Sequence, residues 1–384
     1  MQTVHAVVEC PLRESFRTRQ VAGMFDLAVG AGLRSEFSVK IPTLESRWNI
    51  GVIVGPSGSG KTTIARRAFG DRIVDRWDWP ADRSILDGFP AEMGIRQITQ
   101  LLGSVGFSSP PAWMRPFHLL SNGEQFRVNL ARTLAQMPEL AVVDEFTSVV
   151  DRTVARIGSC AISRAVRRSG RRLVAVSCHY DILPWLEPDW ILDMADGSLQ
   201  ERSEENASSD VFRRPAIQME IVRCSAAAWK LFSRHHYLSG KLHQSARCFA
   251  GLIENQPAAF VAVLPFPHPV RSGWREHRCV CLPDFQGVGI GHAMSEFVAS
   301  LYAATGKPYW SVTSHPAMIH HRARSKNWRM IREPSRIRRG ICGNRAMSAW
   351  DKTLSSKRLT ASFEYAGETR AEMARGFGIG VQNG

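Results

Sequence analysis

Short apolar runs alternate with helical stretches over about the first 200 residues. The runs NIGVIVG (49–55), ELAVVDE (139–145) and RRLVAVSCH (171–179) are each flanked by polar or charged segments. Buried strands of a parallel sheet have this form, with helices in the intervals between them. The pattern predicts an α/β domain over residues 1–200.

The order of elements changes after a polar segment at 201–215, ERSEENASSDVFRRP, whose composition indicates a linker. Beyond it, the pattern predicts an α+β domain over 216–350. Its expected elements are a strand at 216–224, a helix at 226–238, a hairpin at 248–266 turning at Asn255-Gln256, a strand at 275–282, a helix at 290–304, a strand at 309–314 and a helix from about Met318. A C-terminal tail, 351–384, carries little pattern and is expected to be loosely ordered.

Length and composition fit two globular domains, with 384 residues, 44% of them hydrophobic and 22% charged. No run approaches the ~18 apolar residues of a membrane span, and the N-terminus lacks the pattern of a secretory signal. The eight cysteines are scattered, and only Cys279 and Cys281 lie close together. This usage fits free thiols better than a disulfide framework or a zinc site. We expect a cytoplasmic protein without a membrane span.

Net charge divides unevenly along the chain. Residues 1–210 hold 24 basic and 25 acidic side chains, whereas residues 211–384 hold 25 basic and 10 acidic ones. A basic excess in one half indicates that this half meets a polyanion, with nucleic acid the leading candidate. A solvated basic surface and a site for an acidic cofactor are the alternatives.

The sequence GPSGSGKT from Gly55 to Thr62 fits the phosphate-loop pattern G-x-x-x-x-G-K-[ST] and follows a predicted strand. Its glycines let successive backbone N–H groups point at phosphate oxygens, helped by the positive end of the next helix. Lys61 is expected to reach the β and γ phosphates, and the Thr62 hydroxyl to ligate Mg²⁺. The predicted ATP-binding residues are Gly55, Pro56, Ser57, Gly58, Ser59, Gly60, Lys61, Thr62 and Thr63.

Four later motifs give residues 20–200 a resemblance to the ABC ATPase family. The sequence LSNGE at 120–124 stands where the family has its L-S-G-G-Q signature. Asp144-Glu145 ends an apolar strand in the Walker B position, and 148–151 resembles the D-loop. His179, after the next apolar run, matches the switch histidine.

This resemblance implies a role for each motif residue. Asp144 would help to hold Mg²⁺, Glu145 would orient or deprotonate the attacking water, and His179 would hydrogen-bond the γ-phosphate. Ser121 and Gly123 would contact the γ-phosphate bound to a second copy of the domain. The resemblance therefore implies an ATP-dependent, head-to-tail homodimer.

The chain departs from the family pattern in its signature and Walker B sequences. Asn122 and Glu124 replace a glycine and a glutamine, which could weaken or reshape the contact in trans, and Phe146 stands where the family usually has proline. The interval from Lys61 to Ser121 is short for a transporter ATPase. This short interval favours a non-transport member of the family.

Two further functions have several candidates each. Gln97, Gln100 and Asp87 are all candidates for the Q-loop residue. Phe37 or Trp48 could stack on the adenine, although either aromatic ring also suits the core.

A second glycine-rich loop lies between a predicted strand and a helix, in the sequence CLPDFQGVGIG. With the order of elements around it, it resembles the GNAT acyltransferase family over about residues 217–335. In that family the turn [QR]-x-x-G-x-[GA] presents backbone N–H groups to the pyrophosphate of acyl-CoA. The resemblance implies binding of acetyl-CoA or another acyl-CoA by Gln286, Gly287, Val288, Gly289, Ile290 and Gly291.

Acyl transfer requires a base for the attacking amine and a proton donor for the departing thiolate. The candidate residues are His236, Tyr237, Ser314 and His315, with His235, His320, His321 and Tyr309 as further options. Asp284, beside the loop, is expected to cap the turn.

A basic run at 320–340, HHRARSKNWRMIREPSRIRRG, is the strongest nucleic-acid feature. Guanidinium groups bind phosphates, and an interleaved aromatic such as Trp328 can stack on bases. The alternative is a solvated basic face. The combination resembles phage-encoded DNA modification enzymes of the Mom type, whose GNAT-like fold acts on nucleobases.

The sequence thus predicts an α/β P-loop ABC ATPase domain followed by an α+β GNAT-like acyltransferase domain that acts on nucleic acid, with ATP-driven dimerisation gating transfer. Three alternatives stay open. The chain could be an acetyltransferase for a protein or a small amine. It could be a nucleic-acid-binding ATPase with a non-catalytic C-terminal domain. It could also be an ABC transporter ATPase subunit, which would need a membrane partner.

Overall fold

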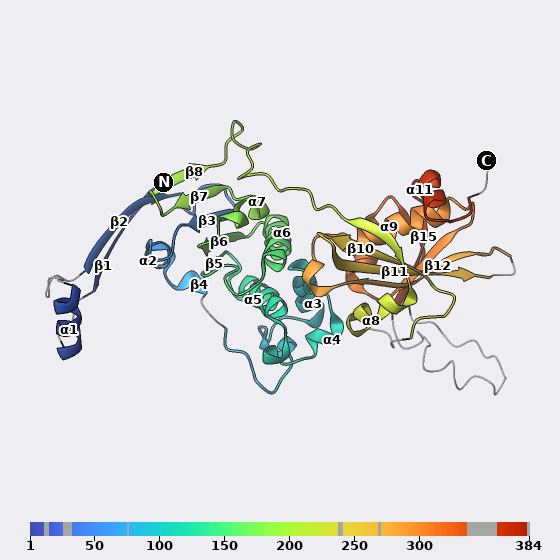
Figure 1. The fold of residues 1–384 in the computed structure, drawn as a ribbon, viewed down its shortest axis with the longest axis horizontal. Helices are drawn as coiled ribbons and strands as arrows, with labels where there is room; N and C mark the ends of the chain where they lie inside the picture. Colours follow the sequence, from blue (N-terminus) through green and yellow to red (C-terminus); the bar gives the residue numbers. More distant parts are fainter. Residues whose placement is uncertain are drawn as a thin grey trace. The chain divides into compact units, whose positions relative to one another are not determined.

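The computed structural model describes residues 1–10, 15–25, 33–74, 77–236, 241–267, 270–335 and 359–381. The chain forms two compact units, each made of two stretches (Figure 1). One unit joins Met1–Asp78 to Arg132–Pro215, and the other joins Trp79–Ala131 to Ala216–Gly384. The stretch 79–131, which contains the predicted signature, therefore belongs with the C-terminal part of the chain.

The first unit is built on a six-stranded sheet of order β4-β5-β6-β3-β7-β8, in which all neighbours are parallel except β7 and β8. The strands are β3 (Ile50–Val54), β4 (Ile73–Val74), β5 (Leu140–Val143), β6 (Arg172–Ser177), β7 (Trp190–Asp193) and β8 (Ser198–Glu201). All five residues of the central strand β3 are buried, which explains its uninterrupted apolar sequence.

Helix α2 (Lys61–Phe69) shares one hydrophobic core with a hairpin of β1 (Gln2–Cys10) and β2 (Leu33–Ile41). Helix α6 (Arg152–Ser169) packs on β3 and β6 and is buried along most of its length. Short helices α1 (Phe16–Phe25) and α7 (Leu183–Leu186) complete the helices of this unit. The layered packing fixes the ends of the parallel strands, where the motif residues lie.

The second unit is built on a seven-stranded sheet of order β14-β15-β13-β12-β11-β10-β9. Its strands are β9 (Glu220–Cys224), β10 (Arg247–Ile253), β11 (Gln256–Phe266), β12 (Gly273–Cys281), β13 (Tyr309–Thr313), β14 (Trp328–Ser335) and β15 (Thr360–Tyr365). Every pair is antiparallel except β12 and β13, which are parallel and pair only through Trp274–Tyr309 and Arg275–Trp310. Beyond Arg275, β12 therefore has no backbone pairing with β13.

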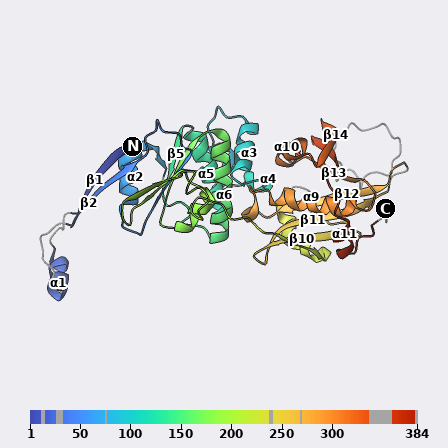
Figure 2. The ribbon, with the colours of Figure 1, turned by 90° about the horizontal axis from the view of Figure 1, so that it is seen from above.

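Helices of this unit come from both of its stretches (Figure 2). They are α3 (Ile95–Ser104), α4 (Pro110–Trp113), α5 (Asn122–Gln136, whose last turn extends into the first unit), α8 (Trp229–Phe232), α9 (Ile290–Ala303), α10 (Pro316–Arg324) and α11 (Ala371–Gly376). Helix α9 packs on β11 and β12 through its buried side, and α3 contacts α10.

Most predicted elements of the C-terminal half are present. Strand β14 and helix α11 were not predicted, and α11 lies in the tail that was expected to be loosely ordered. Three further points differ. The hairpin turns at Glu254-Asn255, where both residues have positive φ, one position before the predicted turn. The predicted helix at 226–238 is broken into 3₁₀ turns around α8. Residues 360–365, in the predicted tail, form β15 between β13 and β14.

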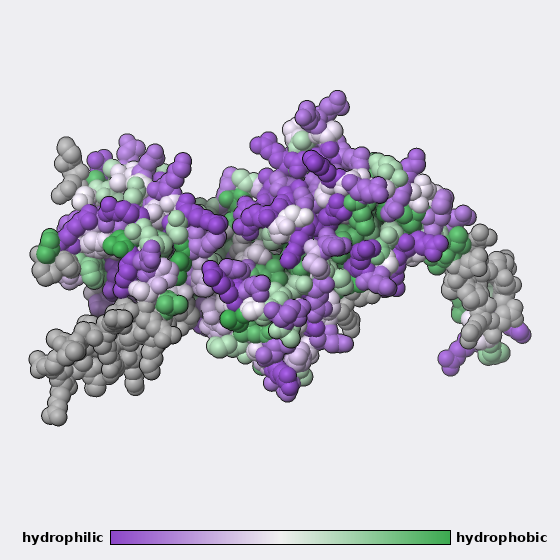
Figure 3. All heavy atoms as spheres, turned by 180° about the vertical axis from the view of Figure 1, so that it is seen from behind, coloured by the Kyte–Doolittle hydropathy of each residue, from purple (hydrophilic) through white to green (hydrophobic). Residues whose placement is uncertain are grey.

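Within the described ranges, no helix has the length and apolarity needed to cross a membrane. The face of the molecule in Figure 3 is mainly hydrophilic, with small separate apolar patches.

Candidate functional site

The predicted nucleotide residues of the first unit lie at one edge of its sheet. Lys61 and Thr62 follow β3, Asp144 and Glu145 follow β5, and His179 follows β6. Because β5, β6 and β3 are parallel neighbours, their carboxyl ends all meet at this edge. Ligands of open α/β sheets bind outside such an edge, so the topology gathers these residues as a nucleotide site requires.

The phosphate loop curls around the ammonium group of Lys61. Its Nζ donates to the carbonyl oxygens of Gly55 and Pro56 at 2.9 and 2.6 Å, in place of the phosphate oxygens that it is predicted to bind. Gly60 begins α2 with a φ of 85°, and a Cβ there would lie 2.6 Å from the Phe37 ring. A side chain at residue 60 would therefore clash with the Phe37 ring and would also disfavour the backbone conformation of the loop.

The Walker B segment turns sharply after β5. Glu145 and Thr147 have φ of 48° and 68°, in the left-handed region that non-glycine residues rarely adopt. Such residues cost roughly 1–3 kcal/mol each and concentrate at functional sites. The turn is held by a bond from the Phe146 backbone N–H to the Val176 carbonyl oxygen at 2.8 Å and leaves Glu145 exposed, while Phe146 is buried.

The first residues after β5 and β6 are linked by Ser177. Its hydroxyl donates to the Phe146 carbonyl oxygen at 2.9 Å and accepts from the His179 backbone N–H at 3.1 Å. Asp151 of the predicted D-loop caps α6 by accepting from the Val154 N–H at 3.0 Å. The structure thus sets the half-buried His179 beside the Glu145 turn.

Thr62 and Asp144 supply a hydroxyl and a carboxylate, the hard oxygen ligands that Mg²⁺ prefers. The donor chemistry of these two side chains therefore fits the predicted metal.

The signature segment of the second unit explains its Glu124. The Ser121 backbone N–H donates to the Glu124 carboxylate at 3.0 Å, and the Glu124 N–H donates to the Ser121 hydroxyl at 3.3 Å. This reciprocal pair is a capping box at the start of α5. The side chain of Glu124 is 7% exposed, so the departure from glutamine keeps a carboxylate beside Ser121.

The two candidates for adenine stacking, Trp48 and Phe37, differ in burial. Trp48 is buried in the core, makes an edge contact with Trp190 at 5.5 Å between centroids and donates to the Thr43 carbonyl oxygen at 3.0 Å. Stacking of adenine on Trp48 is therefore excluded, because the ring has no free face. Phe37 is half-buried against Gly60 and stays a candidate.

The candidates for the Q-loop have local roles. The Gln97 side chain accepts from the Gly94 N–H at 2.9 Å, and the Asp87 carboxylate accepts from the Ser84 hydroxyl at 2.8 Å. Gln100 is exposed on α3.

The second glycine-rich loop joins β12 to α9. Gly287 and Gly289 have φ of 92° and 90°, and Gly289 caps α9. Among the described residues, apart from its two chain neighbours and the backbone of its own helix, no atom lies within 4 Å of where a Cβ of Gly289 would be. Left-handed residues at the start of a helix turn successive N–H groups to one side and form an anion-binding concavity. The loop follows the part of β12 that does not pair with β13.

Gln286 of this loop is held on both sides. Its Nε2 donates to the Cys281 carbonyl oxygen at 2.8 Å, and its Oε1 accepts from the Ser108 backbone N–H at 2.7 Å. His315 Nε2 lies 3.0 Å from the carbonyl oxygen of the same Ser108, so it carries the ring proton. One residue of the signature-bearing stretch therefore contacts two predicted residues of the C-terminal half.

The bond to Ser108 fixes the orientation of the His315 imidazole. Burial lowers its pKa, against the opposing effect of the bond to Ser108. Its other ring nitrogen, Nδ1, is buried with no hydrogen-bond partner among the residues that the structure describes.

The remaining acyl-transfer candidates are dispersed. His236 makes an edge contact with Trp229, whereas the ring of His321 stacks on His292 at 3.8 Å between centroids. Tyr309 is fully buried, and burial raises its pKa well above the ordinary value, which makes it a poor base. Ser314 is half-buried directly before His315, His235 is half-buried, His320 is exposed and Tyr237 lies outside the described residues.

A buried ion pair not expected from the sequence lies where β12 and β13 part. Arg322 of α10 donates to the Glu276 carboxylate at 2.9 Å, and their side chains are 1% and 6% exposed. Ser295 and Ser311 complete the network around Glu276. The next residue, His277, is the extra residue of a β-bulge opposite Ala262 and Val263. Such bulges are common next to active sites.

The basic run differs from its prediction. Trp328 is 5% exposed and the Arg322 guanidinium lies 4.2 Å from the centre of its ring, so the indole cannot stack on a base. Arg329 pairs with Glu364 at 3.0 Å. Arg324 and Lys326 are exposed, and 336–340 lie outside the described residues.

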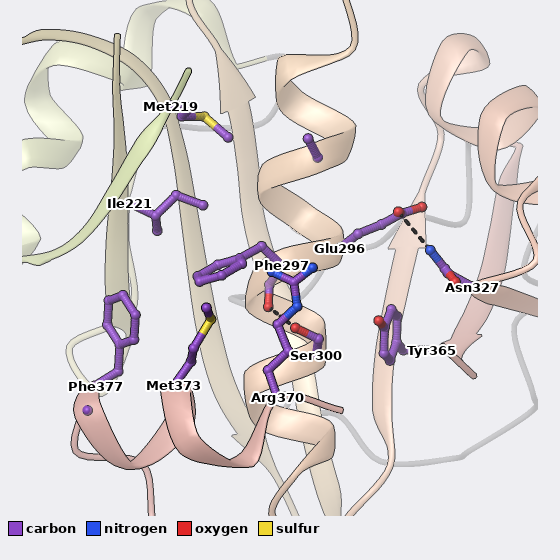
Figure 4. Close-up of a pocket in the computed structure, with 12 residues that line it drawn as sticks. Met219, Ile221, Glu296, Phe297, Ser300, Asn327, Tyr365, Arg370, Met373 and Phe377 are labelled. Atoms are coloured by element: carbon purple, nitrogen blue, oxygen red, sulfur yellow. Dashed lines mark hydrogen bonds between the residues drawn. The ribbon is translucent and has the colours of Figure 1, made fainter. Parts of the chain in front are cut away.

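A pocket of about 710 Å³ lies along the middle of α9 (Figure 4). It is lined by Met219, Ile221, Ala293, Glu296, Phe297, Ser300, Asn327, Tyr365, Arg370, Met373, Gly376 and Phe377. Its charged groups already have partners, because Glu296 accepts from Asn327 at 3.0 Å and the Arg370 guanidinium lies 5.1 Å from the Phe297 ring centre. None of the predicted site residues lines this pocket.

Arg127 and Ser108 contact the second glycine-rich loop but are marked by no sequence motif. Arg127, an interior residue of α5, donates to the Asp284 carbonyl oxygen at 2.9 Å, and Ser108 contacts Gln286 through its backbone N–H. The charge of Arg127 on the apolar side of the signature helix is the only sequence feature that points to this contact.

Comparisons with known proteins agree on the first part of the chain. No protein-family model matches. The aliphatic sulfonates import ATP-binding protein SsuB 2 of Frankia alni is 30% identical over 239 residues, covering 57% of this chain and 89% of that protein. The Fe(3+) ions import ATP-binding protein FbpC of Pseudomonas fluorescens is 32% identical over 161 residues, and this chain spans 45% of its length.

Solved structures that resemble the chain are ATP-binding cassettes. One is a dimeric post-hydrolysis state bound to ADP and Pi, with 15% identity, a TM-score of 0.38 and coverage of 53% of this chain and 100% of that one. Another is the ADP conformation of a transporter cassette, with 16% identity, a TM-score of 0.35 and coverage of 55% and 97%. With the 30% identity over 89% of the Frankia protein, the chain belongs to the ABC ATPase family.

Proposed function

We propose that the chain hydrolyses Mg·ATP at the edge formed by β3, β5 and β6, as a head-to-tail dimer. The observation that carries this proposal is the parallel register that places Lys61, Asp144, Glu145 and His179 at that edge. Lys61 exchanges its two carbonyl partners for phosphate oxygens, Glu145 takes a proton from the attacking water, and His179 donates to the γ-phosphate. Thr62 and Asp144 would hold Mg²⁺, which would supply positive charge beside the phosphates.

Two processes are candidates for coupling to this ATP hydrolysis: transport and acyl transfer. The comparisons favour a transporter ATPase subunit over an acyltransferase fusion, because the curated relatives include import ATP-binding proteins. In that role the chain would power import through a membrane partner, and purified chain alone would hydrolyse ATP without any group transfer. The predicted acyl-CoA and nucleic-acid functions find no counterpart in these relatives.

A specific observation favours the second candidate, an acyl-CoA-dependent N-acyltransferase in the C-terminal half. The strand order of the second unit, with its one parallel pair parting at β12, resembles a GNAT sheet, and the loop from Gln286 to Gly291 opens α9. The backbone N–H groups of this loop would hold the pyrophosphate. His315, whose ring is fixed by Ser108 and whose pKa is lowered by burial, is the candidate base that we favour.

Nucleic acid is the acceptor that charge favours, since residues 211–384 hold 25 basic against 10 acidic side chains. Arg324 and Lys326 provide exposed cations for phosphate contacts. A protein or small-amine acceptor is the alternative.

Phosphate release by the full chain tests the first proposal. Lys61→Ala should abolish it, and unchanged release would contradict the assigned site. Loss of acetyl-CoA binding in Gly289→Glu tests the second, because a Cβ at a φ of 90° strains the loop and the added carboxylate repels pyrophosphate.

A further inference from the structure

The signature helix and the second glycine-rich loop are joined by three contacts within one compact unit. Arg127 of α5 donates from Nη2 to the Asp284 carbonyl oxygen at 2.9 Å, and its Nη1 lies 3.7 Å from the Asp284 carboxylate. The Arg127 side chain is 0% exposed, so its guanidinium is shielded from water. Breaking a contact of a buried charge is costly, because water does not replace the lost interaction.

The second contact is close packing of backbone against backbone. A Cβ added to Gly106 would lie 2.5 Å from the Gln286 carbonyl oxygen and 3.3 Å from the Gly287 Cα. Gly106 also has a φ of 86°. Because Gly106 has no side chain, the stretch after α3 can pack directly against the peptide between Gln286 and Gly287 at the start of the loop.

The third contact is made by the backbone of Ser108, whose N–H donates to Gln286 at 2.7 Å and whose carbonyl oxygen accepts from His315 at 3.0 Å. The two peptide units that meet at Ser108 thus fix the first residue of the loop and the imidazole that follows β13. A displacement of Ser108 would move both contacts.

The same helix carries the capping box of Ser121 and Glu124 at its start. Arg127 lies six residues beyond Ser121, about 9 Å along a helix that rises 1.5 Å per residue. A rigid helix carries any displacement of Ser121 to Arg127 and from there to Asp284.

We infer that Gly106, Ser108 and Arg127 are positioning residues for the loop Gln286–Gly291 and for His315, through which ATP bound at Ser121 alters the affinity of the loop for pyrophosphate. This inference rests on the proposed function for its ligand. The signature segment would thus act at two places, on ATP through Ser121 and on the second glycine-rich loop of its own chain through Arg127.

The test uses the full chain with Glu145→Gln, which slows hydrolysis. Amide hydrogen exchange over 284–293 and the Kd for acetyl-CoA are measured with and without Mg·ATP. ATP should change exchange of these amides and shift the Kd by at least about fivefold, the lower end of usual coupling between sites. By linkage, acetyl-CoA should shift the Kd for ATP by the same factor.

Matched variants identify the route. Gly106→Ala should remove the effect of ATP, whereas Gly170→Ala, at a similar φ of 67° with nothing within 4 Å, should keep it. Arg127→Met should also remove it, with Arg132→Met on the same helix as control, since Arg132 bonds Asp78 instead. Should Arg127→Met fail to fold, Gln286→Met interrupts the same link at Ser108.

The outcomes separate the two ideas. If acetyl-CoA does not bind but ATP still alters exchange over 284–293, the acyl-CoA proposal fails and the positioning inference holds. If acetyl-CoA binds with the same Kd and the same exchange whether or not ATP is present, the inference is overturned and the acyl-CoA proposal holds. Retention of the ATP effect in both Gly106→Ala and Arg127→Met would also overturn it.

Discussion

The guanidinium of Arg127 donates to the backbone oxygen of Asp284 at 2.9 Å, from a side chain that is fully buried. These residues lie 157 positions apart in the chain, one on the signature helix and the other at the entrance to the second glycine-rich loop. Both residues lie in one compact unit, which joins 79–131 to the C-terminal part of the chain. The contact gives the signature segment a partner inside its own chain.

Glu145→Gln should slow phosphate release at least about 100-fold, the usual effect of losing a general base. The isosteric amide keeps ATP binding, so the variant should accumulate as an ATP-bound dimer. Light scattering after size exclusion, with and without Mg·ATP, measures the mass. A monomer under both conditions would contradict the head-to-tail dimer.

Glu124→Gln should strengthen the ATP-dependent dimer and raise its ATPase rate. The amide oxygen can still accept from the Ser121 N–H, so the capping box survives, whereas the negative charge that would repel a γ-phosphate is removed. Titration of phosphate release against ATP checks this. An unchanged melting temperature shows that α5 is intact, and a slower rate would argue against contact of ATP with this segment.

Acid should destabilise the second unit through two histidines. Burial lowers the pKa of His292 from 6.5 to about 3, and burial, reinforced by nearby Arg278, does the same to His277. The unfolded chain then binds more protons than the folded chain below about pH 6.5, so the unfolding free energy falls as pH drops from 6.5 toward 3. Each histidine contributes about 1 kcal/mol per pH unit in this window.

His292→Phe keeps an aromatic ring against His321 and cannot bind a proton. Urea unfolding at pH 7 and pH 5 should show a smaller loss of stability in this variant than in the parent chain. Equal losses in the two proteins would mean that His292 is not buried in its neutral form.

Arg322→Met should cost about 3–5 kcal/mol of unfolding free energy, because it leaves the buried Glu276 carboxylate without its cation. Arg152→Met breaks an ion pair whose side chains are 40% and 46% exposed, and should cost at most about 1 kcal/mol. Urea unfolding of both variants gives the comparison. Similar costs would place Glu276 in contact with water.

The sequence located both loops because each depends on local chemistry. Gly60 and Gly289 are required by their own backbone angles, and the apolar runs before them predict the strands that set their positions. Lys61 and Glu145 could also be assigned to one site from the sequence. Both follow predicted parallel strands, and the carboxyl ends of such strands lie at one edge of the sheet.

Features that depend on distant packing were not predictable. Trp48 and Trp328 are of a residue type that can stack on a base, but both rings are buried, Trp48 against Trp190 and Trp328 against Arg322 and Tyr365. The Ser108 contacts use its backbone N–H and carbonyl oxygen, which every residue except proline possesses. The strand Thr360–Tyr365 gains its place from pairing with β13, about 50 residues earlier, and not from its own pattern.

We propose above that one chain holds two separate pyrophosphate sites. Calorimetric titration of the full chain with ATP and with acetyl-CoA, each in the absence and presence of the other, tests this most directly in the parent, Lys61→Ala and Gly289→Glu. We expect both ligands to bind together, Lys61→Ala to lose only ATP binding, and Gly289→Glu to lose only acetyl-CoA binding. Competition between the ligands, or no heat from acetyl-CoA in the parent chain, would contradict two separate sites and favour a transporter ATPase.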